Sequence, residues 1–213
     1  ASEMKALLES GLVERRVDAG AVRSLLLRGS VYQPRTLIKG VEMLPPAHAL
    51  IHERGQTRIE RFWNFGTNRH AELRGFGYED QVDAMRKLLR NTVKAQMISD
   101  VPVGAFLSGG VDSASLVALM ASEAGGRVKT FSVGFDETLS AVDETGEAGR
   151  IATHLGTDHH RVVVDGAEIA DNFDHVVTAL DQPSVDGLNS YLVSRAAAEH
   201  VKVAISGTGG DDL

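Results

Sequence analysis

In the stretch Val101-Pro-Val-Gly-Ala-Phe-Leu-Ser-Gly-Gly-Val-Asp-Ser113, a strand, a turn and the start of a helix follow one another directly. The apolar first half predicts a buried strand, and the apolar run 114–121 predicts a helix. A turn between a strand and a helix directs several backbone N–H groups, and the positive end of the helix dipole, at one point. We therefore expect this turn to bind a phosphate or pyrophosphate group.

The side chains of the turn suit an anion that is accompanied by a cation. Gly109 and Gly110 allow positive φ and a close approach of the backbone to a phosphate, while Ser108 and Ser113 offer hydroxyl donors. Asp112 would repel a phosphate by itself, so we expect it to hold Mg²⁺, which bridges to the phosphates. The alternative interpretation is an ordinary turn rich in serine and glycine.

The order of elements along the chain predicts an α/β fold. Strands are expected at 103–107, 128–134, 159–164 and 201–206, and helices at 78–98, 112–122, 143–155, 166–180 and 188–199. This alternation favours a parallel sheet with helices on both faces, preceded by a small α+β part with helices at 2–9 and 18–28 and a hairpin at 48–62. The loops 108–113, 134–138 and 206–212 would then leave the carboxyl ends of strands and converge.

Composition bounds the class of protein. The chain has 213 residues, a net charge of −7 and no cysteine. The negative charge disfavours partners such as nucleic acid or an anionic membrane. No apolar run reaches the length of a membrane span and no secretory signal is evident, so we expect a cytoplasmic protein whose partners are small molecules.

The turn 108–113 is not a Walker A loop, because no lysine occurs between Val101 and Gly126. It resembles the pyrophosphate loop of ATP-pyrophosphatases, which attack the α-phosphate of ATP and release pyrophosphate. Several other motifs resemble the glutamine-hydrolysing asparagine synthetases. These motifs are Pro34-Arg-Thr-Leu-Ile-Lys-Gly40, Leu44-Pro-Pro46, Arg61-Phe-Trp-Asn64, Thr130-Phe-Ser-Val-Gly-Phe135, His154-Leu-Gly-Thr-Asp-His-His160, Asp181-Gln-Pro-Ser184, Tyr191-Leu-Val-Ser-Arg195 and Ile205-Ser-Gly-Thr-Gly-Gly-Asp-Asp-Leu213.

The resemblance implies an adenine nucleotide alpha hydrolase-like sheet and an ATP-dependent amidation. Aspartate would become asparagine through β-aspartyl-AMP, with release of AMP and pyrophosphate, and ammonia would come from glutamine hydrolysis. ATP and Mg²⁺ are the implied cofactors, and Asp112 and Asp211 are the implied catalytic and metal-binding carboxylates. The implied nucleotide-binding residues are Phe106, Leu107, Ser108, Gly109, Gly110, Asp112, Ser113, Val133, Ser206 and Gly207. Phe106 and Val133 would suit the core of a strand equally well.

The resemblance also implies a division of the chain. Residues 1–66 are expected to be the remnant of a glutaminase-like domain with its linker, and residues 67–213 a synthetase domain truncated at its carboxyl end. The glutaminase of this family uses an N-terminal cysteine, and this chain has none. We therefore expect a fragment that carries the ATP site and has little turnover by itself. A homodimer of the complete enzyme stays open.

Two positions depart from the family pattern. Thr208 stands where many members have glutamate, and Asp212 stands where most have glutamate. The loss of a charge at Thr208 leaves open another carboxylate substrate, as in a β-lactam synthetase-like enzyme or a related adenylating amidotransferase. A non-catalytic nucleotide-binding module is the alternative from a different class.

Overall fold

The computed structural model describes residues 1–64, 75–135 and 144–209. It divides into two compact units. The sheet unit consists of residues 77–176 and 188–213, and the hairpin unit of residues 1–76 and 177–187. None of the helices in the described ranges combines the length and the apolar character that crossing a membrane requires.

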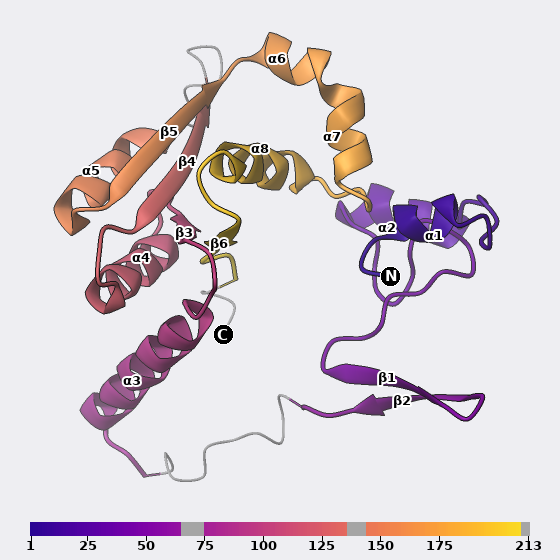
Figure 1. Cartoon of the computed structure of the whole chain (residues 1–213), viewed down its shortest axis with the longest axis horizontal. Coiled ribbons are helices and arrows are strands. Elements are labelled where there is room, and N and C mark those ends of the chain that lie inside the picture. The colour runs from indigo at the N-terminus through magenta and orange to yellow at the C-terminus, as the bar shows by residue number, and fades with distance from the viewer. Residues whose placement is uncertain (65–74, 136–143, 210–213) are drawn as a thin grey trace. The chain divides into compact units, whose positions relative to one another are not determined.

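The sheet unit is built on four parallel strands in the order β5-β4-β3-β6. Ala105 of β3 pairs with Thr130 of β4 on one side and with Ile205 of β6 on the other. The predicted parallel sheet is confirmed, and β3 is an inner strand (Figure 1). The strands are β3 (Val103–Phe106), β4 (Lys129–Phe135), β5 (Asp158–Val164) and β6 (Val203–Ile205).

Helices cover both faces of this sheet, as predicted. On one face, α3, α4 and α5 enclose a core that includes Ala105, Val117 and Met120. On the other face, α8 packs over Phe131 and Val201. The helices of this unit are α3 (Tyr78–Gln96), α4 (Val111–Glu123), α5 (Thr145–Leu155), α6 (Gly166–Asp171), α7 (Phe173–Ala179) and α8 (Gly187–Ala198), with α7 continuing into the hairpin unit.

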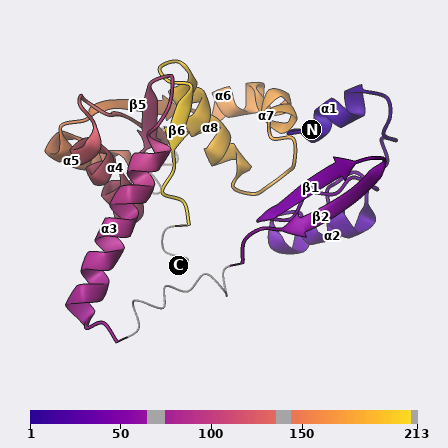
Figure 2. The same ribbon diagram turned by 60° about the horizontal axis from the view of Figure 1, so that its bottom comes forward.

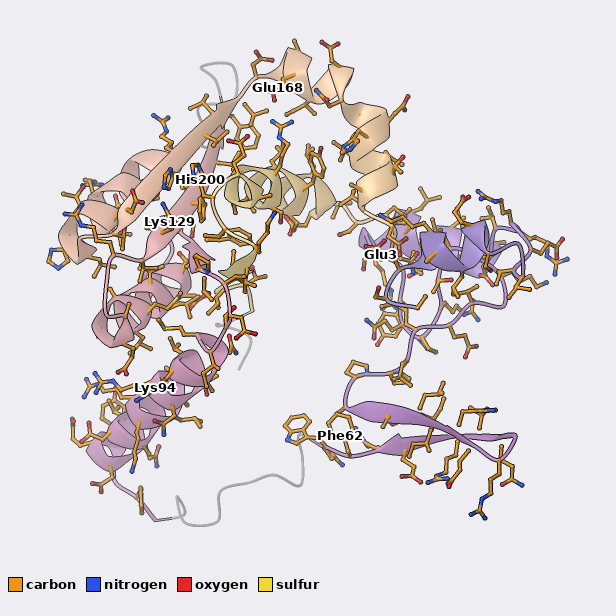
Figure 3. The ribbon with its side chains drawn as sticks, in the orientation of Figure 1. Glu3, Phe62, Lys94, Lys129, Glu168 and His200 are labelled. Carbon is orange, nitrogen blue, oxygen red and sulfur yellow. The ribbon has the colours of Figure 1, made fainter. Side chains whose placement is uncertain are left out.

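The single helix predicted at 166–180 is wrong, because the chain forms two helices that meet at Asn172. The side-chain amide of Asn172 donates to the carbonyl oxygen of Glu168 at 2.8 Å. An asparagine that bonds to a local carbonyl in this way competes with the helical backbone pattern. Glu168 of α6 also pairs with Arg195 of α8, which ties the first of the two helices to the sheet unit (Figure 3).

The apolar face of α3 is only partly buried. Val93 is 4% exposed and belongs to the core between the helices and the sheet, with Met97 packed against it. Toward the amino end of the helix, Met85, Leu88 and Leu89 are each more than 40% exposed. Among the described residues, only the carboxyl end of this apolar face therefore contacts the core.

The hairpin unit contains two short helices and a two-stranded hairpin, as predicted. The hairpin turns at Arg54 and Gly55, which both have positive φ (52° and 77°), the geometry of a tight two-residue turn. Its strands lie side by side (Figure 2). The Asp18 side chain accepts from Ala21 N–H and caps the second helix. The elements are α1 (Met4–Glu9), α2 (Ala19–Arg28), β1 (His48–Glu53) and β2 (Gln56–Arg61).

Residues 177–187 belong to the hairpin unit although they lie far along the chain. The Asp181 carboxylate accepts from the N–H groups of Met4 and Lys5 at 2.6 and 2.8 Å. It thereby caps α1, whose own N-cap residue supplies no side-chain bond. Val185 N–H adds a bond to the carbonyl of Gly29 at 2.9 Å. The segment is therefore held by specific polar contacts.

Histidines on β5 pack against β4 at the start of the strands. His159 has its ring between Thr130 and Ser132, with Nδ1 2.9 Å from Thr130 Oγ1 and Nε2 3.2 Å from Ser132 Oγ. Nearby, Lys129 forms an ion pair with Asp158 at 2.7 Å, and this hydrogen bond lowers the pKa of Asp158 (Figure 3). Burial, together with the charge of His160, lowers the pKa of His159 from its ordinary value of 6.5.

The histidine network predicts that the fold loses stability in acid. The unfolded chain takes up a proton on His159 near pH 6.5, whereas the folded chain resists this protonation. The stability that neutral His159 contributes to the fold is therefore complete above that pH and is lost as the pH falls below it. We expect the urea midpoint of wild type to be lower at about pH 5 than at about pH 7.5. In His159→Gln this slope should be smaller, while in the exposed control His154→Gln it should be unchanged. An equal slope in all three proteins would contradict the assignment.

Candidate functional site

The turn predicted to bind phosphate lies at the carboxyl end of the inner strand β3. Loops that follow β3 and β6 meet there, because parallel neighbours place their carboxyl ends at one edge. A Cβ placed on Gly207, just after β6, would lie 2.9 Å from Ser113 N and 3.0 Å from Ser113 Cα. The loop after β6 thus touches the backbone of the first turn of α4. Residues 136–138 and 210–212 of the predicted convergence lie outside the described residues.

Two serines hold the turn together. The hydroxyls of Ser108 and Ser113 lie 2.9 Å apart, and Ser108 N–H donates to Ser113 Oγ at 3.1 Å. Ser113 Oγ also donates to the carbonyl of Gly110 at 3.1 Å. Ser113 is 9% exposed, so its hydroxyl is placed to shape the turn from within. Ser108, in contrast, is exposed and can turn toward a ligand.

Gly109 and Gly110 do not use the positive φ that glycine allows. Neither is among the positive-φ glycines of the structure, and Gly110 has φ −79° as the N-cap of α4. The absence of a side chain at Gly109 serves packing instead, because a Cβ there would lie 3.1 Å from Glu147 Cβ. Gly109 thus lets α5 lie close to the turn, whereas a Cβ on Gly110 would meet only Ser108 Oγ, at 3.3 Å.

Three N–H groups at the start of α4 have no acceptor among the described residues. Val111, Asp112 and Ser113 occupy the first turn, where no intrahelical acceptor exists. Among the described residues, none accepts a hydrogen bond from these three groups, and the first backbone bond of the helix comes from Ala114 N–H to Gly110 O. Free amides at a helix start, with the dipole behind them, attract an anion.

The other amides of the turn have acceptors within the protein. Gly110 N–H donates to Ser108 Oγ at 3.1 Å, and Gly109 N–H donates to the Glu144 carboxylate at 3.3 Å. Glu144 reaches the turn because β4, which leads toward α5, is the neighbour of β3. No spacing in the sequence marks that contact.

Asp112 is the described carboxylate that fits a cation in this site. It is half-buried in the first turn of α4, and no described side chain or N–H bonds or pairs with its carboxylate. No group of three or more metal-binding side chains occurs in the described part of the chain. Mg²⁺ is commonly held by one or two carboxylates together with substrate phosphates and water, so Asp112 fits such an ion. Asp211, the predicted second ligand, lies outside the described residues.

The residues matched to adenosine binding lie around the same strand ends. Leu107 is 2% exposed with its side chain in the core, so only its backbone is placed to contact a ligand. Phe106 and Val133 are half-buried on their strands, and Phe106 packs toward Phe131. Ser206 is exposed, and its Oγ lies 2.7 Å from Thr208 Oγ1. The turn 108–113, Phe106 and Ser206 thus lie at the same edge of the sheet.

Comparison with known proteins assigns this chain to a family. Residues 84–213 match the asparagine synthase family, and residues 1–63 match the glutamine amidotransferase domain family. The chain belongs to the asparagine synthase family. This confirms the resemblance that the motifs predicted, and it places the free amides of α4 within the family's matched region.

Two curated proteins of known name resemble this chain over its whole length. It is 28% identical to asparagine synthetase [glutamine-hydrolyzing] 3 of Bacillus subtilis, over 100% of the chain and 36% of that protein. It is 30% identical to amidase chyE of Penicillium rubens, over 100% of the chain and 33% of that protein. The chain therefore spans about a third of the length of these curated relatives. Among solved structures, an NH3-dependent NAD synthetase from Campylobacter jejuni matches 58% of this chain and 54% of its own, with 16% identity and a TM-score of 0.40.

Proposed function

We propose that this chain carries the ATP site of an enzyme that amidates aspartate to asparagine. The observation that carries the proposal is that three amides and the Asp112 carboxylate lie together at the start of α4, at the carboxyl edge of the sheet, with no partner among the described residues. Membership of the asparagine synthase family supports the adenylating chemistry. The cofactors proposed for the site are ATP and Mg²⁺.

In this proposal the chain's own groups bind and orient the nucleotide. The amides of Val111, Asp112 and Ser113 would receive the β- and γ-phosphates, and charge that develops on them would fall on preorganised donors. Asp112, with Asp211 as second carboxylate, would hold Mg²⁺, whose chemistry is to stabilise the departing pyrophosphate. Phe106, Val133 and Ser206 would contact adenosine.

The reaction proposed for the complete enzyme has two steps. An oxygen of the aspartate side chain attacks the α-phosphorus of ATP, the bond to the β-phosphate breaks, and β-aspartyl-AMP and pyrophosphate form. Ammonia then attacks the acyl carbon and AMP leaves. Exclusion of water protects the adenylate between the steps. We propose glutamine hydrolysis as the source of ammonia, since residues 1–63 match a glutamine amidotransferase domain family.

We propose a domain boundary near residues 66 and 67. The two family matches end at residue 63 and begin at residue 84, which supports a division between them. The boundary itself lies outside the described residues. Residues 1–66 would be glutaminase-like and residues 67–213 synthetase-like, with 177–187 packed into the hairpin unit.

Binding of MgATP to this chain tests the proposed site. In titration calorimetry, wild type should bind ATP more tightly with Mg²⁺ than without it. In Asp112→Ala the affinity for MgATP should fall roughly tenfold or more, because removal of even an outer-shell partner of a bound metal lowers metal affinity by about that factor. Asp100→Ala, which removes an exposed carboxylate ahead of β3 at the opposite edge, is the matched control. Equal affinities of Asp112→Ala and wild type would contradict the proposal.

A different carboxylate substrate is the second candidate. The neutral Thr208 beside Ser206 favours it, and a relative named as an amidase matches this chain with 30% identity, close to the 28–33% of relatives named asparagine synthetase. Exchange of labelled pyrophosphate into ATP by the complete enzyme, stimulated by one carboxylic acid at a time, separates the candidates. Stimulation by aspartate supports the first, and stimulation by another acid alone supports the second.

A further inference from the structure

The carboxylate of Glu144 occupies an amide of the phosphate turn. Its Oε2 accepts from Gly109 N–H at 3.3 Å. Glu144 is also the N-cap residue of α5, yet its side chain makes no capping bond to that helix. An N-cap carboxylate ordinarily bonds to the free amides of its own helix. Here the side chain turns to the loop between β3 and α4 instead.

Glu144 brings a negative charge to the turn. Glu147, the other acid against Gly109, forms an ion pair with Arg150. No cationic partner is found for Glu144 within residues 1–64, 75–135 and 144–209. A carboxylate and a phosphate repel each other and both accept from N–H groups, so they cannot share the Gly109 amide.

We propose that Glu144 is an internal competitor for the anionic tail of the nucleotide. The inference rests on the proposed function of the turn and goes beyond it, because it assigns an affinity-setting role to a residue outside the turn. Nucleotide must displace the carboxylate from Gly109 in order to use that amide. The hydrogen bond from Gly109 N–H to Glu144 is thereby exchanged for one to phosphate. Wild type therefore binds nucleotide more weakly than a variant that lacks the Glu144 charge.

Two substitutions separate the charge from the hydrogen bond. Glu144→Gln keeps an acceptor for Gly109 and removes the charge, and Glu144→Ala removes both. Glu147→Gln is the matched control on the same helix. Exposed charged contacts of this kind change affinity by about two- to fivefold. Titration with MgATP and with magnesium pyrophosphate should therefore show binding about two- to fivefold tighter in both Glu144 variants, and unchanged binding in Glu147→Gln.

The amide resonance of Gly109 reports the contact without nucleotide. Its chemical shift should differ between wild type and Glu144→Gln, because the acceptor changes from a carboxylate to an amide. Affinity that is equal or weaker in both Glu144 variants, or a Gly109 resonance that does not differ between wild type and Glu144→Gln, overturns the inference alone. Absence of binding in every variant overturns the proposed function and this inference with it.

Discussion

Gly207→Ala is expected to abolish tight nucleotide binding and to destabilise the sheet unit. The new Cβ would lie 2.9 Å from Ser113 N and 3.1 Å from the carbonyl carbon of Asp112. Both are backbone atoms, so α4 or the loop after β6 must shift. Overpacking of this kind costs about 1–3 kcal/mol of stability. Loss of even one bond to a charged phosphate costs about 1.5–3 kcal/mol, which corresponds to roughly tenfold or more in affinity.

Gly149→Ala is the matched control for this substitution. Gly149 lies within α5, and a Cβ there meets nothing within 4 Å. Alanine in place of a helical glycine should stabilise the protein by up to about 1 kcal/mol and leave MgATP affinity unchanged. Calorimetry for binding and urea unfolding for stability measure the two effects. Wild-type affinity in Gly207→Ala would show that the contact with Ser113 is not needed for the site.

Phe131→Ala is expected to cause the largest loss of stability. The Phe131 side chain is completely buried, and its ring stacks against His160 and His200 with centroids 5.3 and 5.7 Å away. Gly104 on β3 leaves room for the ring, because a Cβ there would lie 2.7 Å from it. Truncation of a buried phenylalanine to alanine costs about 3–5 kcal/mol. That is a large part of the roughly 5–15 kcal/mol that holds an ordinary domain together, so a strongly lowered urea midpoint is expected.

Phe173→Ala provides the comparison for this core substitution. Phe173 begins α7 and is 57% exposed. Its truncation should change the free energy of unfolding by no more than about 0.5 kcal/mol. Urea unfolding followed by circular dichroism gives both values. Similar losses in Phe131→Ala and Phe173→Ala would contradict the assignment of Phe131 to the core between β4 and α8.

The parts of the fold that local pattern specifies could be predicted from the sequence. Apolar runs with turn residues between them gave the order of strands and helices, and the parallel sheet followed from that order. The tight turn at Arg54 and Gly55 and the cap at Asp18 were also predictable, because both depend on neighbouring residues. The break at Asn172 was missed, since its side-chain bond to Glu168 competes with a helix that propensity alone favours.

The position of the turn 108–113 between a strand and a helix was predictable, but its contacts were not. The turn 108–113 was located by its glycines, yet neither has positive φ, and Gly109 serves packing against α5 instead. The contacts of Gly207 with Ser113 and of Glu144 with Gly109 join residues far apart in the chain. They depend on which strands are neighbours, and no local spacing encodes that.

A crystal structure of this chain with MgATP tests the central claim most directly. The account predicts phosphate oxygens about 3 Å from the N–H groups of Val111, Asp112 and Ser113. It further predicts a cation on the Asp112 carboxylate and Glu144 turned away from Gly109. Phosphates bound elsewhere, with the first turn of α4 in contact with solvent or protein groups alone, would contradict it.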